Sequence, residues 1–235
     1  MGWSDRPGPL TLRHAEGEET TKFLVPSVSQ HEAEGNFKMP AKTRRITAAD
    51  ILSDAEYNAR RAQLRAASIA EKKDRRMEVG PYATLYFENY TSMWLQVQEM
   101  LRIEKGGAGQ IEGELEAYNP LIPQGDELIA TFMIEIEDTD RRERELRQLG
   151  HIEDSVFLDV GRDRIKATPT DYEDRTTPDG KTSSVHWLRF KFTPEQIRAF
   201  RSGTEPVVIG MAHPNYGHMA VMAPAVRAAL AKDFA

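Results

Sequence analysis

The segment 212–219 gathers the side chains that are best suited to chemistry. Four groups that can bind metal ions, transfer protons or hold a small ligand lie within it: His213, Asn215, Tyr216 and His218. Pro214 and Gly217 disfavour a regular helix or strand there. The apolar run 206–211 that precedes the segment predicts a strand. We therefore expect a functional site carried on an irregular turn at the end of that strand, with both imidazoles facing a common pocket and Asn215 or Tyr216 at its rim.

A divalent metal ion is one ligand that this turn could bind. His213 and His218 are five residues apart, which permits both imidazoles to bind one ion. Further ligands would come from Glu88, Glu99 or His186. The alternative is that the imidazoles hydrogen-bond backbone carbonyls and only fix the shape of the turn. The sequence contains no cysteine, so a cysteine-ligated cluster, a disulfide and a cysteine nucleophile are excluded, and any metal would need histidine and carboxylate ligands.

For His186 and Glu99, a purely structural role is the alternative to a functional one. His186 lies in the predicted strand 184–192, where alternation places it on an apolar face, so a buried structural histidine is the simpler interpretation. Glu99 lies in the predicted helix 90–104, three residues before Arg102, which indicates a surface ion pair. If that helix face borders the histidine turn, Glu99 is instead a general base or metal ligand.

These side chains must be positioned by helices and strands that follow no regular βαβ alternation. Capping residues Ser53 and Glu56 begin a long surface helix over 54–75. Periodicity and turn residues predict further helices over 90–104, 110–117, 139–149 and 224–234 with a short one from 194, and strands over 83–88, 127–137, 156–160, 164–168, 184–192 and 207–211. We expect Gly150 to close the helix 139–149, and the strand 127–137 to have one wet face. The fold class is α+β, a single domain whose antiparallel or mixed sheet is packed by the helix 90–104.

The N-terminal region differs from the rest in composition. Residues 1–45 lack periodicity and are rich in Gly, Pro, Glu, Ser and Thr, which predicts a disordered extension before a domain over 46–235. Met39 is a plausible alternative start. No apolar run reaches the roughly 18–20 residues of a membrane span, and no secretory signal pattern begins the chain. We therefore expect a soluble cytoplasmic protein that does not contact a membrane.

Charge is unevenly distributed along the chain. The net charge is −6, yet the segment 53–76 has seven basic and four acidic residues. An acidic body with one basic helix argues against nucleic-acid binding. The basic side chains of that helix, including Arg60, Arg61 and Arg65, form either a solvated face or a docking site for an acidic protein.

From Arg45 onward the chain resembles a bacterial family known as domain of unknown function 3501. The segments that carry the resemblance are Ile46–Leu52, Val79–Pro81, Tyr86–Tyr90, Glu99–Lys105, Tyr118–Pro123, Thr193–Gln196 and His213–His218. The resemblance implies a context beside a rubrerythrin-like protein and an iron–sulfur oxidoreductase, and hence a part in oxidative-stress handling. Without cysteine the chain cannot hold the cluster, and without a Glu-x-x-His pair it cannot be the rubrerythrin.

Two hypotheses from different classes follow. In the first, the chain is a non-enzymatic partner protein of a redox system that docks through its basic helix. In the second, it is a metal-binding protein or metal-dependent enzyme with His213 and His218 as ligands. The sequence identifies no substrate and no reaction, so it does not decide whether the protein is an enzyme.

Overall fold

The computed structural model describes residues 44–170 and 174–235, which belong to one compact unit. The predicted N-terminal extension lies outside these ranges except for its last two residues. The α-helices are α1 (Asp54–Lys73), α2 (Tyr90–Glu104), α3 (Ala108–Tyr118), α4 (Thr139–Leu146), α5 (Pro194–Ser202) and α6 (Pro224–Leu230). The strands are β1 (Arg76–Val79), β2 (Ala83–Phe87), β3 (Glu127–Ile134), β4 (Val156–Val160), β5 (Asp163–Pro169), β6 (Val185–Lys191), β7 (Val207–His213) and β8 (Tyr216–Val221). Short 3-10 helices are η1 (Ala48–Asp50), η2 (Asn119–Leu121), η3 (Ile152–Ser155) and η4 (Ala231–Asp233).

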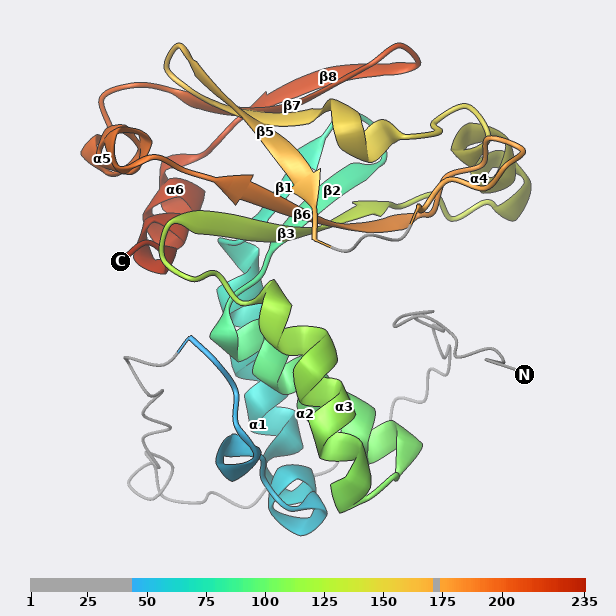
Figure 1. Ribbon diagram of the computed structural model, residues 1–235, viewed down its shortest axis with the longest axis vertical. Coiled ribbons are helices and arrows are strands. Elements are labelled where there is room, and N and C mark those ends of the chain that lie inside the picture. Colours follow the sequence, from blue (N-terminus) through green and yellow to red (C-terminus); the bar gives the residue numbers. More distant parts are fainter. Residues whose placement is uncertain (1–43, 171–173) are drawn as a thin grey trace, which may run out of the picture. The chain divides into compact units, whose positions relative to one another are not determined.

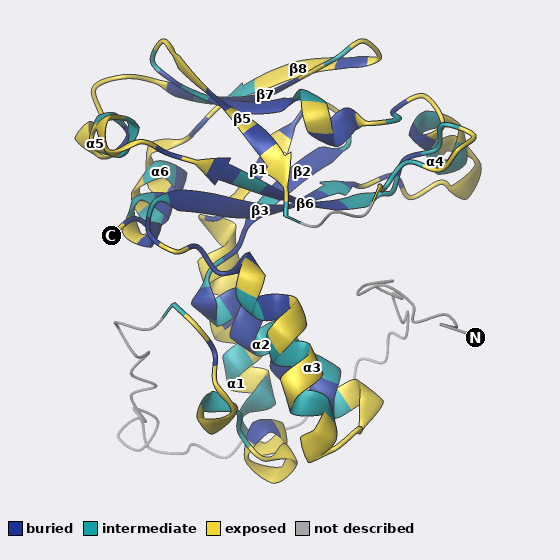
Figure 2. Ribbon diagram, viewed as in Figure 1, coloured by how far each residue is buried: buried dark blue, intermediate teal, exposed yellow. Residues whose placement is uncertain are grey.

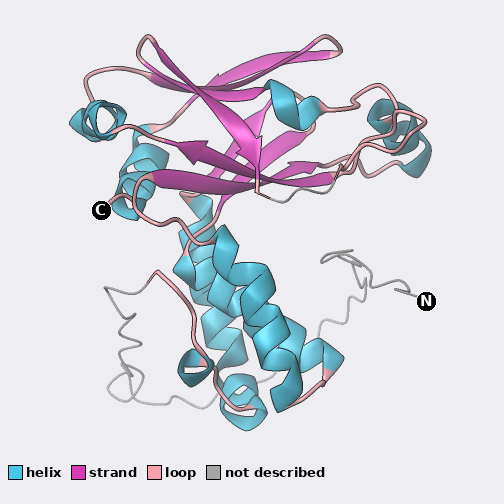
Figure 3. Cartoon of the chain, viewed as in Figure 1, coloured by secondary structure: helices cyan, strands magenta, loops and turns pink. Residues whose placement is uncertain are grey.

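The eight strands form one antiparallel sheet in the order β1-β2-β3-β6-β5-β4-β7-β8 (Figure 1, Figure 3). The predicted α+β class is therefore confirmed. At its centre β3 pairs with β6, with Thr131 opposite Trp187. The two ends of the order approach one another, because the Tyr216 hydroxyl on β8 donates to Val79 O at 2.7 Å and accepts from Ala83 N–H at 3.1 Å. We call this contact the seam; it closes the twisted sheet on itself.

Buried residues run along most of the strands (Figure 2), and they form the main core together with side chains of the helices α4, α5 and α6. Phe192 of the segment after β6 packs edge-to-face with Phe200 of α5 and with Phe234 after η4, at centroid distances of 5.8 and 4.8 Å. Figure 1 shows α5 and α6 at this end of the sheet and α4 at the other end. Each fully buried aromatic or aliphatic side chain contributes about 1.5–3 kcal/mol to stability, so these rings anchor one end of the fold.

Helices α1, α2 and α3 pack on each other around a second set of buried side chains (Figure 1). Tyr57 of α1 meets Trp94 of α2 edge-to-face with centroids 6.4 Å apart. The prediction that the helix 90–104 packs the sheet is wrong, because the buried side chains of α2 belong to this second set and not to the main core of the sheet. The thin apolar stripe of α1 needs a partner, and the apolar side chains of α2 provide it.

Buried polar groups join these helices to the sheet. Glu88 accepts hydrogen bonds from Thr131 at 2.6 Å and from Ser92 at 2.5 Å. Arg75 donates to two backbone carbonyls of residues 87 and 88 and to the carboxylate of Asp233. Residues 127–132 of β3 are consequently buried on both faces, so the prediction of one wet face is wrong for that half of the strand. The alternation of apolar residues in β3 identified the face that lies in the core. Glu88, which contacts Thr131 on the other face, is remote in sequence.

Candidate functional site

The predicted irregular turn is a regular β-hairpin. Strands β7 and β8 pair from Val208 opposite Val221 to His213 opposite Tyr216, which leaves a two-residue turn. Neither Pro214 nor Asn215 has a positive φ. Proline suits the first central position of such a turn because its φ is already fixed near −65°. The prediction that Pro214 and Gly217 disfavour a regular strand here is therefore wrong, because His213 and Tyr216 on either side of the turn belong to paired strands.

The tip of this hairpin is tied to the segment that follows α4. Asn215 donates from its backbone N–H to His213 Nδ1 at 3.2 Å, so the other ring nitrogen, Nε2, carries the proton. That nitrogen lies 3.2 Å from Gly150 O. The Asn215 side chain donates to Gln148 O at 2.8 Å. His213 and Asn215 thus make the backbone hydrogen bonds expected of the structural alternative.

Tyr216 and His218 occupy different environments. Tyr216 is only 2% exposed and its hydroxyl forms the seam, so it does not lie at the rim of a pocket as predicted. Burial raises the pKa of Tyr216, although the N–H groups of Tyr82 and Ala83 oppose the shift. His218 is exposed and packs its ring edge-on to Tyr216, with centroids 4.6 Å apart. The register places His213 opposite Tyr216 and His218 opposite Met211, so the two imidazoles are not direct cross-strand neighbours.

A second group of potential ligands lies beside the hairpin tip. His151, Glu153 and Asp174, which we call the His151 cluster, each offer one ligand atom, and these atoms lie within 4.8 Å of one another. Over residues 44–170 and 174–235, no other set of three or more histidine and acidic side chains meets this criterion, and neither His213 nor His218 belongs to it. His151 directly follows Gly150, whose carbonyl contacts His213.

Thr176 holds two members of the His151 cluster. His151 donates its backbone N–H to Thr176 Oγ1 at 2.9 Å, and Thr176 donates its own N–H to Asp174 Oδ1 at 2.9 Å. His151 also has a left-handed backbone with φ 57°, a conformation that costs about 1–3 kcal/mol and often occurs at functional sites. The prediction that Gly150 closes the helix is wrong, because α4 ends at Leu146 and the left-handed residue that follows is His151. Gly150 is needed for space instead, because a Cβ there would lie 2.9 Å from Gly180 O.

The third member, Glu153, forms a buried pair with His186. Glu153 Oε2 lies 3.5 Å from His186 Nδ1, and both side chains are over nine-tenths buried. His186 Nε2 is 2.9 Å from Ser183 O, which only accepts, so that nitrogen is protonated. The imidazole also stacks on Phe132 with centroids 5.4 Å apart, so the prediction of a histidine on the apolar face is confirmed. Burial raises the pKa of Glu153, and the charge of Asp154 raises it further.

Sequence reasoning missed all three members of the His151 cluster. One signal was present, since His151 and Glu153 are two residues apart in the sequence. The position of Asp174, about twenty residues later, follows only from the tertiary structure.

Glu99 serves a different role from the one predicted. It lies between α1 and α2, accepts a hydrogen bond from the Tyr57 hydroxyl at 2.6 Å and pairs with Arg61 through two bonds of 2.8 and 3.0 Å. Arg102 donates to Asn58 instead of pairing with Glu99. Burial alone would raise the pKa of Glu99, but the hydrogen bonds from Arg61 and Tyr57 outweigh it and lower the pKa below 4.5. Glu99 therefore joins two helices, and its partners come from α1.

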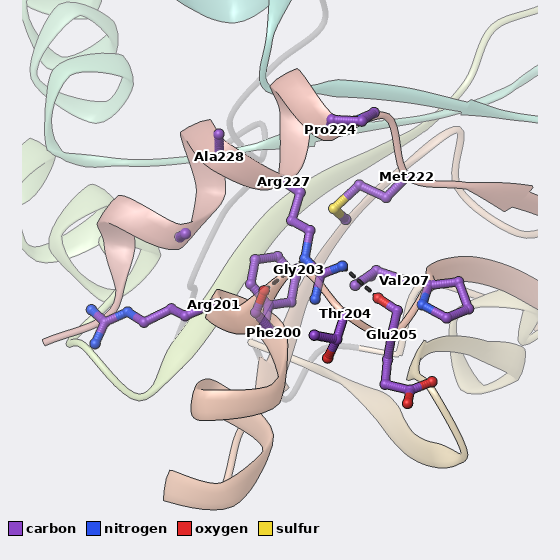
Figure 4. A pocket seen from close by; sticks show the side chains of 12 residues that line it. Phe200, Arg201, Gly203, Thr204, Glu205, Val207, Met222, Pro224, Arg227 and Ala228 are labelled. Carbon is purple, nitrogen blue, oxygen red and sulfur yellow. Dashed lines mark hydrogen bonds between the residues drawn. The ribbon is translucent and has the colours of Figure 1, made fainter.

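A hollow of about 500 Å³ lies between the end of α5 and α6 (Figure 4). Its two guanidinium groups are engaged by backbone carbonyls. Arg227 donates to the carbonyls of residues 199, 200 and 205, and Arg201 to those of residues 234 and 235. Burial lowers the pKa of Arg227. Arg227 caps the last turns of α5, as a basic residue commonly caps the C-terminus of a helix, so the protein itself engages both guanidinium groups of the hollow.

None of the described helices combines the length and apolarity needed to cross a bilayer. The family described as "Protein of unknown function (DUF3501)" matches residues 45–234. A crystal structure of a novel protein of unknown function from Burkholderia pseudomallei K96243 is 37% identical, has a TM-score of 0.75, and the match covers 81% of this chain and 99% of that one. The comparison with curated proteins gave no match.

Proposed function

The chain belongs to the DUF3501 family, and on that premise we propose that it is a cytoplasmic accessory protein that docks on an acidic protein of a redox or oxidative-stress system. The resemblance noted above implies two candidate partners, a rubrerythrin-like protein and an iron–sulfur oxidoreductase. Docking requires a surface that is exposed and chemically distinct from its surroundings.

The observation that carries the proposal is an exposed isoleucine among cations on α1. Ile69 is 68% exposed. Arg65, Lys72 and Lys73 are exposed too, and their spacing from Ile69 places all four on one side of the helix. We call these four residues the α1 stripe. Tyr57 and Ser68 are the buried residues of the helix. An apolar side chain ringed by positive charge fits a partner surface with an apolar spot among carboxylates.

Two of the basic side chains that the sequence places on this helix are engaged within the fold and are not available for docking. Arg61 is held by Glu99 between two helices, and Arg75 is only 5% exposed and paired with Asp233. Reversing the charge of Arg61 would place two carboxylates together and damage the fold. A test of docking must therefore use the α1 stripe and leave Arg61 unchanged.

Biolayer interferometry with the purified candidate partners tests the proposal. We expect the double variant Ile69→Ser, Lys72→Glu to bind at least about tenfold more weakly than the wild type, and raising the salt from about 50 to 300 mM to weaken wild-type binding. Arg144→Glu is the matched control, because Arg144 is an exposed arginine on another helix, α4. Equal affinity of the wild type and the α1 variant, or no binding of either partner, would contradict the proposal.

A further inference from the structure

We propose that the His151 cluster binds a first-row divalent transition-metal ion, such as Zn²⁺, Mn²⁺ or Fe²⁺. The ion would be held by one imidazole nitrogen and two carboxylate oxygens, at the end of the sheet beside the tip of the β7–β8 hairpin. This inference is independent of docking through α1, and it uses none of the ligands that the sequence predicts.

The spacing of the ligand atoms fits one ion. The three atoms lie within 4.8 Å of one another. Atoms bound at about 2.1 Å from a common ion are about 3–4 Å apart, so modest rotations of side chains bring them into position. His151 and Asp174 are exposed, which leaves the ion a path from solvent and lets these side chains adjust.

Glu153 supplies an independent observation. Its side chain is 8% exposed, and its Oε2 atom accepts no hydrogen bond from the described part of the chain. A buried carboxylate oxygen without a donor costs free energy, and a cation bound beside it would offset that cost. His186 Nδ1 lies 3.5 Å from this oxygen but carries no proton when Nε2 holds the one that Ser183 O accepts, so it is not that donor.

The local backbone prepares the cluster for binding. Thr176 accepts a hydrogen bond from the backbone of His151 and donates one to the side chain of Asp174. The strained φ of His151 is held by this contact and by the packing of Gly150 against Gly180. A backbone that is held before binding loses less conformational entropy when the side chains close on the ion.

The donor set indicates the class of ion. One nitrogen and two oxygens suit Zn²⁺, Mn²⁺ and Fe²⁺, whereas Ca²⁺ takes six to eight oxygen ligands. Three protein ligands leave at least one coordination position for water or for another small molecule.

Isothermal titration of the untagged full chain, first stripped with a chelator, tests the inference with Zn²⁺ and Ca²⁺ as probes. We expect the wild type to bind one Zn²⁺ per chain and to prefer it to Ca²⁺. Asp174→Asn and Glu153→Gln should each weaken Zn²⁺ binding at least about tenfold. His218→Gln is the matched control, because it removes the exposed histidine of the alternative hairpin site and should leave the affinity unchanged.

Thermal unfolding supplies a second readout. At about 100 times the wild-type Kd, Zn²⁺ should raise the Tm of the wild type by about 5 °C or more and that of Asp174→Asn by no more than about half as much. Asp174 is exposed, so the metal-free variant should unfold within about 2 °C of the metal-free wild type. The inference is overturned if the wild type binds no Zn²⁺, if every variant binds it equally, or if only His218→Gln loses it.

Discussion

The seam that Tyr216 forms gives a sharp prediction for Tyr216→Phe. The substitution keeps the ring and removes the hydroxyl, which donates to Val79 O at 2.7 Å and accepts from the N–H groups of Ala83 at 3.1 Å and Tyr82 at 3.3 Å. Val79 and Ala83 are almost fully buried, at 0% and 1% exposure. Their backbone groups would therefore lose a partner in a place that water reaches poorly.

The size of the effect follows from these two buried groups. An unsatisfied buried donor or acceptor costs about 1–3 kcal/mol, and the longer bond from the half-buried Tyr82 adds little. We expect Tyr216→Phe to lower the free energy of unfolding by about 2–4 kcal/mol. For a domain of this size that corresponds to a fall in Tm of about 6–12 °C.

Urea unfolding followed by circular dichroism measures this loss, with Tyr82→Phe as the matched control. Tyr82 stacks beside Tyr216, and its hydroxyl donates to Glu145 at 2.9 Å, where both side chains are partly exposed. The control should lose less than about 1 kcal/mol. If Tyr216→Phe is no less stable than Tyr82→Phe, the assignment of the seam as the contact that closes the sheet is wrong.

Two further predictions concern other parts of the chain. Because the pKa of Glu99 is lowered below 4.5 in the folded state, its contacts with Arg61 and Tyr57 contribute stability that is present above pH 4.5 and is lost as the pH falls through the folded pKa. Glu99→Gln should cost about 1–2 kcal/mol at pH 7 and progressively less as the pH falls through that folded pKa, as measured by urea unfolding across pH. Deletion of residues 1–38, which lie outside the described ranges, should change the Tm by no more than a few degrees in a thermal melt, and a larger drop would show that they pack on the domain.

Local signals in the sequence predicted most of the elements. The helix start at Ser53 and the helix 90–104 are confirmed, because a capping box and a continuous apolar stripe are encoded within a few neighbouring residues. The predicted strands 156–160 and 164–168 are confirmed for the same reason, and the left-handed Gly161 lies in the two-residue turn that joins them. His186 was placed correctly by alternation alone.

Features that depend on distant partners were not predictable in this way. The covering of Thr131 by Glu88 and the pairing of Glu99 with Arg61 join residues about forty positions apart. The hairpin tip was conspicuous because it gathers four functional groups within a few residues. In the structure, however, the polar side-chain atoms of His213 and Tyr216 form hydrogen bonds to backbone carbonyls. The His151 cluster was inconspicuous in the sequence, because Asp174 is distant from His151 and Glu153 along the chain and only the tertiary structure brings it beside them.

The seam also has a consequence for the order of folding. It joins residues 137 positions apart, Val79 and Tyr216, whereas the β4–β5 and β7–β8 hairpins pair close neighbours. Closing so long a loop costs more chain entropy than closing a local hairpin does. We therefore expect the hairpins to form early in folding and the seam to form late. In the native state the seam should then open more readily than the centre of the sheet. The amide protons of Tyr82 and Ala83 should accordingly exchange with solvent faster than those of β3 and β6.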